Sequence, residues 1–107
     1  MKAYAVAHVK SAQPGAEIVE YLERIDGTLA PFRGRFIIHG DAGEVREGDF
    51  DGNVIVIEFP DRKSARGWYD SGAYQWILPL RIRNTTGWVI LVDGVTADHR
   101  ARDILRA

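Results

Sequence analysis

The sequence predicts an α+β fold in which a four-stranded antiparallel sheet carries helices on one face. Four stretches have the alternating or continuous apolar character of β-strands, at residues 3–9, 36–39, 53–59 and 88–93. Two segments have apolar residues three and four positions apart, the spacing of an amphipathic helix, at residues 14–30 and 62–83. The resulting order, β-α-β-β-α-β, is that of a ferredoxin-like sandwich. Right-handed crossovers place both helical segments on the same face of the sheet.

The first strand and the first helix have the most regular patterns. Residues 3–9 alternate between small alanines on one face and three larger side chains on the other, Tyr4, Val6 and His8. The helix is expected from Pro14 to Ala30, and Pro31 helps to end it. Its apolar stripe consists of Ile18, Leu22, Ile25 and Leu29, with Tyr21 beside it.

The second and third strands differ in regularity. The strand at 36–39 is short and ends in a bend or bulge at the glycines that follow, and residues 44–47 are expected to continue it. The strand at 53–59 is apolar on both faces except for Glu58, a pattern typical of a strand that is covered on two sides.

The second helical segment is predicted as two stretches. Asp61 is a suitable N-cap for a helix over 62–70, and Ser71 for a second stretch over 72–83. Pro79 is expected to kink or restart the second stretch. The side chains expected to face inward are Ala65, Trp68, Tyr69, Tyr74, Ile77, Leu78 and Ile82. After the last strand, Thr96 is expected to cap a short terminal helix.

Length and composition restrict the class of protein. The chain has 107 residues, 46% of them apolar and 27% charged, which predicts one folded domain. With the order of elements above, this is a ferredoxin-like domain over residues 1–95, followed by a tail over 96–107 that is expected to form a short helix. The formal net charge is -1, so no general attraction to nucleic acid is expected. The chain has no cysteine, which excludes disulfides, thiolate zinc sites and iron–sulfur clusters. No signal-peptide segment and no apolar run near the roughly 20 residues of a membrane span is present, so a cytoplasmic protein is expected.

One face of the predicted sheet has no helix to cover it. The third and fourth strands are nevertheless apolar on both faces. An apolar face of that size needs a partner, and a homodimer through the helix-free sheet face supplies one. The other expected partner is a small organic ligand, whereas nucleic acid and membranes are not expected.

Several short motifs along the chain can be compared, in their order and spacing, with those of known families. They are Met-Lys-Ala-Tyr-Ala-Val-Ala-His-Val at the start, Glu20-Tyr21-Leu22, Gly34-Arg35-Phe36, Glu47-Gly48-Asp49, Val56-Ile57-Glu58-Phe59-Pro60, Trp68-Tyr69, Tyr74-Gln75 and Leu80-Arg81. Together they resemble the small bacterial family of domain of unknown function 1330, over about residues 2 to 95. The resemblance implies a dimeric α/β-barrel, in which two ferredoxin-like units pack their sheets together, and no agreed activity.

The resemblance leaves several functions open. Relatives in that superfamily include cofactor-free quinone-oxidising monooxygenases, muconolactone isomerase-like enzymes, heme-binding peroxidase-like proteins and ligand-binding regulatory domains. Fold alone therefore does not determine function.

Three titratable residues are candidates for proton transfer. Glu58 is a carboxylate within an apolar strand, which is costly unless the group is paired or neutral, and a raised pKa would suit a general acid or base. The alternative is a structural ion pair with Arg35 or Arg81. His8 and His39 lie in predicted strands, where imidazole can exchange protons near neutral pH, although a strand histidine is often a structural group. The histidines have no third ligand at a recognisable spacing, so no metal site is expected.

Aromatic residues around the break at Ser71 are candidates for ligand binding. Rings with a polar group can line a pocket for a flat organic molecule, and a core or dimer interface is the alternative. Arg81 could bind a carboxylate through its planar guanidinium, or be solvated or ion-paired instead. The candidate ligand-binding residues are Tyr21, Trp68, Tyr69, Tyr74 and Arg81.

The sequence therefore supports two functional hypotheses of different class. The first is a dimeric small-molecule-binding domain that uses no cofactor. The second is a cofactor-independent monooxygenase or isomerase acting on a small aromatic or lactone substrate. A third hypothesis, heme binding, needs an axial histidine that faces a wide cavity.

Overall fold

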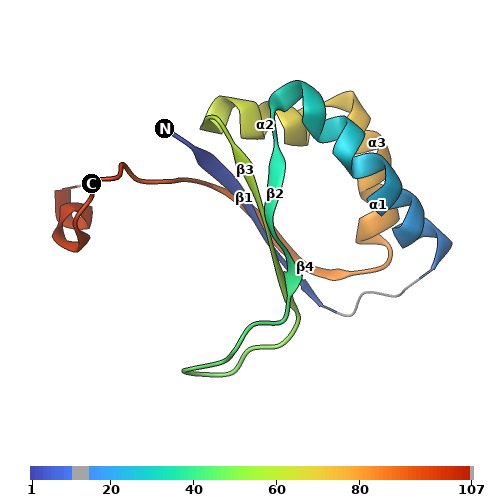
Figure 1. Ribbon diagram of the computed structural model, residues 1–107. Coiled ribbons are helices and arrows are strands. Elements are labelled where there is room, and N and C mark those ends of the chain that lie inside the picture. Colours follow the sequence, from blue (N-terminus) through green and yellow to red (C-terminus); the bar gives the residue numbers. More distant parts are fainter. Residues whose placement is uncertain (11–14, 107) are drawn as a thin grey trace.

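A computed structural model describes residues 1–10 and 15–106 of the chain (Figure 1). Its single described sheet is antiparallel, with the strand order β2-β3-β1-β4. The four strands are β1 (Ala3–Lys10), β2 (Arg35–Asp41), β3 (Asn53–Phe59) and β4 (Thr86–Asp93). Strands β1 and β3 are central, so each forms backbone hydrogen bonds with a strand on both sides.

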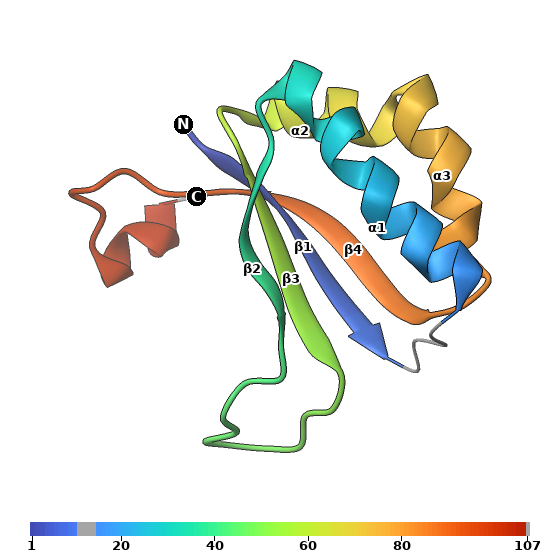
Figure 2. The ribbon, with the colours of Figure 1, turned by 45° about the vertical axis from the view of Figure 1, so that its right-hand side comes forward.

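The three α-helices lie on the same face of the sheet, and no described helix covers the other face (Figures 1 and 2). They are α1 (Ala16–Leu29), α2 (Arg62–Asp70) and α3 (Gly72–Ile82). A short 3-10 helix, η1 (Ala30–Phe32), follows α1, and another, η2 (Ala101–Arg106), lies near the C-terminus. None of the helices in the described ranges is long and apolar enough to cross a membrane.

The core fills the space between the helices and the sheet. Its large fully buried side chains are Leu29, Phe59, Trp68, Tyr74 and Ile77. The polar atoms in this core are satisfied, because the Trp68 indole N–H donates to Thr28 Oγ1 at 2.9 Å, and the Thr28 hydroxyl donates to a backbone carbonyl of α1. Side-chain hydrogen bonding therefore supplements apolar packing where α1 meets α2.

The buried residues of α1 match only part of the predicted stripe. Ile25 and Leu29 are buried as predicted, but Leu22 is 47% exposed, and the buried row also includes Tyr21 and Thr28. Both rows have helical spacing, so periodicity alone could not distinguish them. The predicted helix start at Pro14 lies outside the described residues.

The two predicted caps of the second helical segment are confirmed. Asp61 accepts a hydrogen bond from Ser64 N at 2.7 Å, and Ser71 accepts one from Tyr74 N at 3.2 Å. Helix α3 continues through Pro79 rather than restarting there. Ile82, expected to face inward, is instead 57% exposed. The inward position in the last turn of α3 belongs to Arg81, seven residues after Tyr74 and so on the same helical face.

Strand β2 is irregular, as its sequence indicates. Its pairing with β3 shifts register between Phe36 and Ile38 and again between His39 and Asp41. The prediction that residues 44–47 continue the strand is wrong, because β2 ends at Asp41. Gly40, at the second register shift, and Gly43, just beyond the strand, adopt positive φ, a conformation that glycine allows without steric cost.

The chain beyond β4 extends away from the body of the molecule (Figure 1). The last backbone link between this segment and the sheet is the hydrogen bond from Gly94 N to Lys2 O, at 2.8 Å. Later hydrogen bonds in the described part of the segment are internal, such as those from His99 N to Thr96 O and from Asp103 N to Arg100 O.

Candidate functional site

A cavity of about 60 Å³ lies between the helical layer and the sheet. Its floor is a row of residues that the strand register aligns across the sheet, His39 of β2, Ile55 of β3, Ala7 of β1 and Val89 of β4. Helices α1 and α3 form the roof through Tyr21, Leu22, Ile25, Tyr74 and Arg81. The cavity is thus built by six elements of one chain.

The alanines of β1 provide the room for this cavity. Alternation along the strand directs Ala3, Ala5 and Ala7 toward the helices, and Ala5 and Ala7 line the cavity. Ala3 instead packs in the core, where it is fully buried. A β-branched residue at position 5 or 7 would reach into the space that the methyl groups leave open.

Two tyrosines join α1 to α3 at the cavity. Tyr21 and Tyr74 are 8% and 1% exposed, and their hydroxyl oxygens are 2.8 Å apart, a hydrogen bond in which either can donate. Burial, and then the neighbouring Tyr74, raise the pKa of Tyr21 well above its usual value of 10.0. Tyr21 is therefore a neutral hydroxyl at physiological pH.

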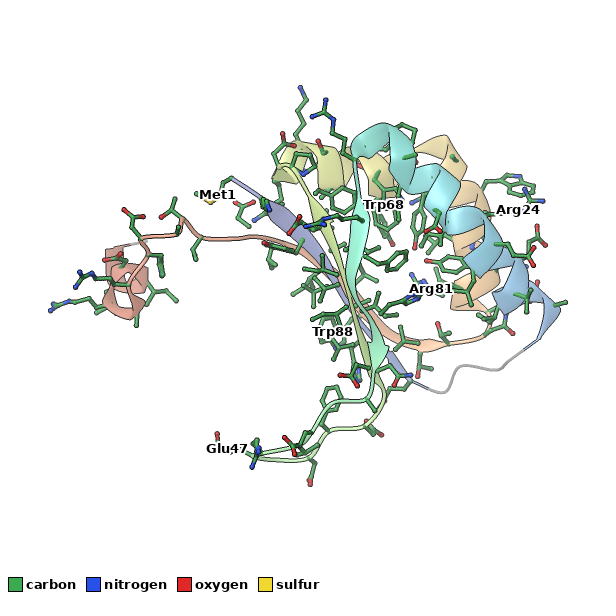
Figure 3. All side chains as sticks on the ribbon, viewed as in Figure 1. Met1, Arg24, Glu47, Trp68, Arg81 and Trp88 are labelled. Carbon is green, nitrogen blue, oxygen red and sulfur yellow. The ribbon has the colours of Figure 1, made fainter. Side chains whose placement is uncertain are left out.

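Arg81 lines the same cavity as these two tyrosines. Figure 3 shows the side chain directed from α3 into the space between the helices and the sheet. Burial lowers the pKa of Arg81, but interaction with Tyr74 and Tyr21 outweighs it, so the pKa is raised above its usual value. Arg81 therefore carries a positive charge at the edge of an otherwise apolar cavity.

Arg81 also lines two neighbouring hollows. One, of about 100 Å³, is lined by apolar residues of β1, α1 and β3 together with Tyr21 and Thr85. The other, of about 480 Å³, is larger and includes Tyr69 and residues at the start of β4. The guanidinium thus lies where the small enclosed cavity meets a larger open one.

His39 is the histidine that lines the cavity. Its ring stacks on Phe36, with 4.3 Å between ring centroids. The two residues share a face although they are three apart in sequence, because the bulge between Phe36 and Ile38 adds a residue to the strand. The bulge therefore aims the imidazole at the helices rather than at the helix-free face.

Glu58 and His8 lie on the opposite face of the sheet from the cavity. Glu58 is paired with Arg35 Nη2 at 3.0 Å and Lys2 Nζ at 3.4 Å. Burial raises the pKa of Glu58, but the contacts with Arg35 and Lys2 outweigh it, so the pKa is lowered from its usual 4.5. This is the structural ion pair that the sequence left as an alternative, with Arg35 rather than Arg81 as the partner.

His8 holds the loop between β2 and β3 against the sheet. Its Nε2 donates to the backbone carbonyl of Asp51, and its ring contacts Phe50 and Trp88, at centroid distances of 5.1 and 5.7 Å. These contacts make it part of the helix-free face.

The five candidate ligand-binding residues do not form one group. Tyr21, Tyr74 and Arg81 meet at the cavity, and Tyr69 lines the adjoining open hollow. Trp68 is 2% exposed and does not line the cavity, because its ring packs against Tyr74 and Phe59 in the core. Among the described residues, no group of three or more acidic or histidine side chains is arranged to hold a metal ion.

This geometry can be compared with known proteins. A family model described as domain of unknown function (DUF1330) matches residues 2–95. The chain belongs to the DUF1330 family. None of the curated proteins matches this DUF1330 sequence.

Solved structures share the fold of this DUF1330 protein. A protein of unknown function from Rhodopseudomonas palustris is 10% identical, with a TM-score of 0.66 over 89% of this chain and 83% of that one. A dimeric ferredoxin-like protein of unknown function from Jannaschia sp. CCS1 is also 10% identical, with a TM-score of 0.68 over 88% and 100%. The cofactor-independent oxygenase SnoaB from Streptomyces nogalater is 16% identical, with a TM-score of 0.60 over 92% and 98%. At these identities the likeness establishes the α+β ferredoxin-like fold.

The sequence did not identify the floor of the cavity in this DUF1330 protein. Its apolar members, Ala7, Ile55 and Val89, belong to ordinary strands, and only their alignment by strand pairing makes them one surface. The alternating alanines of β1 are the feature of the sequence that could have predicted this cavity. Small side chains on the helix-facing side of a central strand leave a space that larger residues would fill.

Proposed function

We propose that this protein binds a small organic molecule in the cavity between its helices and its sheet. The observation that carries the proposal is the convergence of Tyr21, His39, Tyr74 and Arg81 on a cavity whose other walls are apolar. Ligand sites typically combine apolar walls with a few convergent polar groups. Apolar walls favour a hydrocarbon body, and the polar groups fix its orientation.

The size of the cavity restricts the ligand. About 60 Å³ is small compared with the roughly 300 Å³ or more of sites for drug-sized molecules. A compact ligand fills the enclosed part, and a longer one continues past Arg81 into the open hollow. Heme is not supported, because His39 faces only the small cavity and the larger hollow has no histidine in its lining.

The proposal includes a homodimer formed through the helix-free sheet face. The strand register places Val6, Val56 and Ile90 on that face, side by side on three strands. Trp88 and Ile90 are about half exposed, which is unfavourable for large apolar side chains on one contiguous surface. The ferredoxin-like protein from Jannaschia is dimeric, which supports a homodimer here.

Ligand binding is tested with a compound panel and a cavity-filling variant. Calorimetry with small aromatic acids, lactones and quinones should detect at least one ligand of the wild type. Ala7→Val adds two methyl groups at the cavity floor, and β-branched side chains suit a strand, so the variant should fold and lose that binding. Ala101→Val, the same change in the exposed η2, is the control. Equal binding by Ala7→Val and the wild type would contradict the proposed location.

A second candidate function is a cofactor-independent oxygenase or isomerase. His39 favours it, because imidazole exchanges protons near neutral pH and this one lines the cavity. SnoaB, which has this fold, is a cofactor-independent oxygenase. The test is oxygen uptake or product formation from a bound panel compound without added cofactor, compared between the wild type and His39→Gln. A His39→Gln variant that turns over as fast as the wild type would exclude His39 from the chemistry.

A further inference from the structure

Arg81 is a cation with no acidic partner in the part of the chain that the structure describes. Seven ion pairs occur there, and none involves Arg81. Arg83, two residues later, is by contrast paired with Glu17 of α1. A partly buried charge beside apolar walls is unfavourable unless it is compensated, so the surroundings of Arg81 leave a place for an anion.

The neighbouring tyrosines add a hydrogen-bond donor but no charge. Two hydroxyl groups carry two protons, and one proton is used in the bond between Tyr21 and Tyr74. The other is available to an acceptor at the cavity. Arg81 contributes N–H donors in a fixed planar arrangement and has no acceptor. The polar side of the cavity is therefore rich in donors.

No acidic side chain opposes an anion at this place. The residues that line the enclosed cavity and its two neighbouring hollows include no aspartate and no glutamate. The remaining titratable side chain of the cavity is His39. The local field thus favours a negative group although the chain as a whole has a net charge of -1.

We propose that the ligand of this cavity is a small organic monocarboxylate, whose carboxylate is bound by Arg81 and the Tyr21–Tyr74 hydroxyl pair. This rests on the proposed function and specifies its ligand class. A carboxylate matches the planar guanidinium with two parallel hydrogen bonds and has lone pairs left for the hydroxyl. The hydrocarbon part lies on the alanine and valine floor.

The charge balance favours a monocarboxylate over a phosphate ester. A phosphate carries nearly two negative charges at neutral pH, and Arg81 is the one arginine or lysine among the residues that line the three hollows. A second anionic group would face apolar walls without a counter-charge, which is costly. One carboxylate therefore neutralises the site without leaving a buried excess charge.

The experiment compares acids with their uncharged amides. Benzoate, phenylacetate and 3-methylbutanoate are each paired with the corresponding amide, which has nearly the same shape but no charge. Titration calorimetry should show at least one acid binding the wild type about tenfold or more tightly than its amide, since hydrogen bonds to charged groups contribute that much. Arg81→Gln should remove this preference for the acid.

Two further variants control for charge and for folding. Arg81→Lys keeps the charge without the planar pair of donors and should retain part of the acid preference. Arg66→Gln removes a positive charge from the exposed side of α2 and should bind as the wild type does. Thermal unfolding of each variant verifies that it is folded at the temperature of the titration.

The possible results distinguish failure of the carboxylate inference from failure of the proposed function. If no acid binds more tightly than its amide, or Arg81→Gln keeps the preference, the carboxylate inference is overturned. The cavity proposal would still hold if any panel compound binds the wild type but not Ala7→Val. If no compound of either kind binds the wild type, the proposed function fails and the inference fails with it.

Discussion

The hydroxyl pair of Tyr21 and Tyr74 links two helices through a single buried hydrogen bond. The sequence indicated both residues as ligand-binding candidates, because aromatic rings with a polar group can line a pocket, although only Tyr74 lies near the Ser71 break. It did not indicate that they touch, since they are 53 residues apart in the chain. Their contact depends on how α1 and α3 pack on the sheet, which local sequence does not encode.

Removal of one hydroxyl from this pair should destabilise the fold. Tyr21→Phe or Tyr74→Phe leaves the other buried hydroxyl without its partner, which costs about 1–3 kcal/mol. The double variant should be less destabilised than the sum of the two single variants, because neither hydroxyl is then left alone. Urea unfolding of all four proteins measures this coupling, and strict additivity would show that the bond contributes nothing specific.

Glu58 should give the protein a pH-dependent stability in the acid range. Its pKa is lower in the folded protein than its usual 4.5, so its stabilising contribution is present at neutral pH and is lost as pH falls through the folded value. Glu58→Gln should therefore be less stable than the wild type near pH 7, with a difference that shrinks below about pH 4.5. Unfolding curves measured over this range test it, with the exposed Glu23→Gln as control. A difference that grows on acidification would contradict the lowered pKa.

The break between α2 and α3 shows how much an element boundary can be predicted from local sequence. Ser71 was expected to cap the second helix, and it does so while its hydroxyl also donates to Trp68 O at 2.7 Å. Capping involves residues three apart in the chain, so the sequence contains the whole interaction. The strand expected at residues 44–47 was wrong because a strand needs a partner, and β3 pairs with β2 only as far as Asp41.

Substitution of Ser71 should weaken both helices at their junction. Ser71→Ala removes the acceptor for Tyr74 N and the donor to Trp68 O, and the expected loss of unfolding free energy is about 1 kcal/mol. Ser71→Thr keeps the hydroxyl and should recover most of the loss. Chemical denaturation compares the three proteins. A threonine variant as unstable as the alanine variant would show that the hydroxyl is not the cause.

At the scale of the whole molecule, the helix-free face should hold two chains together. Light scattering of the wild type at micromolar concentration should give about twice the 12.0 kDa of one chain. Ile90→Lys places a charge on this face and should give monomers, because a buried unpaired charge in the interface is costly. Trp76→Lys, a change at an exposed apolar residue of α3 on the helical side, should leave the dimer intact. A monomeric wild type, or a dimeric Ile90→Lys variant, would contradict this assembly.

The sequence by itself determined the α+β class, the positions of the strands and helices and the two helix caps. Periodicity, capping and turn residues act over a few positions, so a local pattern is sufficient to specify them. It also determined that the alanines of β1 share one face of the sheet and that Tyr4, Val6 and His8 share the other. Only the tertiary structure decided that Tyr21, His39, Tyr74 and Arg81 meet at one cavity while Glu58 and His8 lie across the sheet. The physical reason is strand register, since the bulge in β2 and the alignment of four strands determine which distant residues become neighbours.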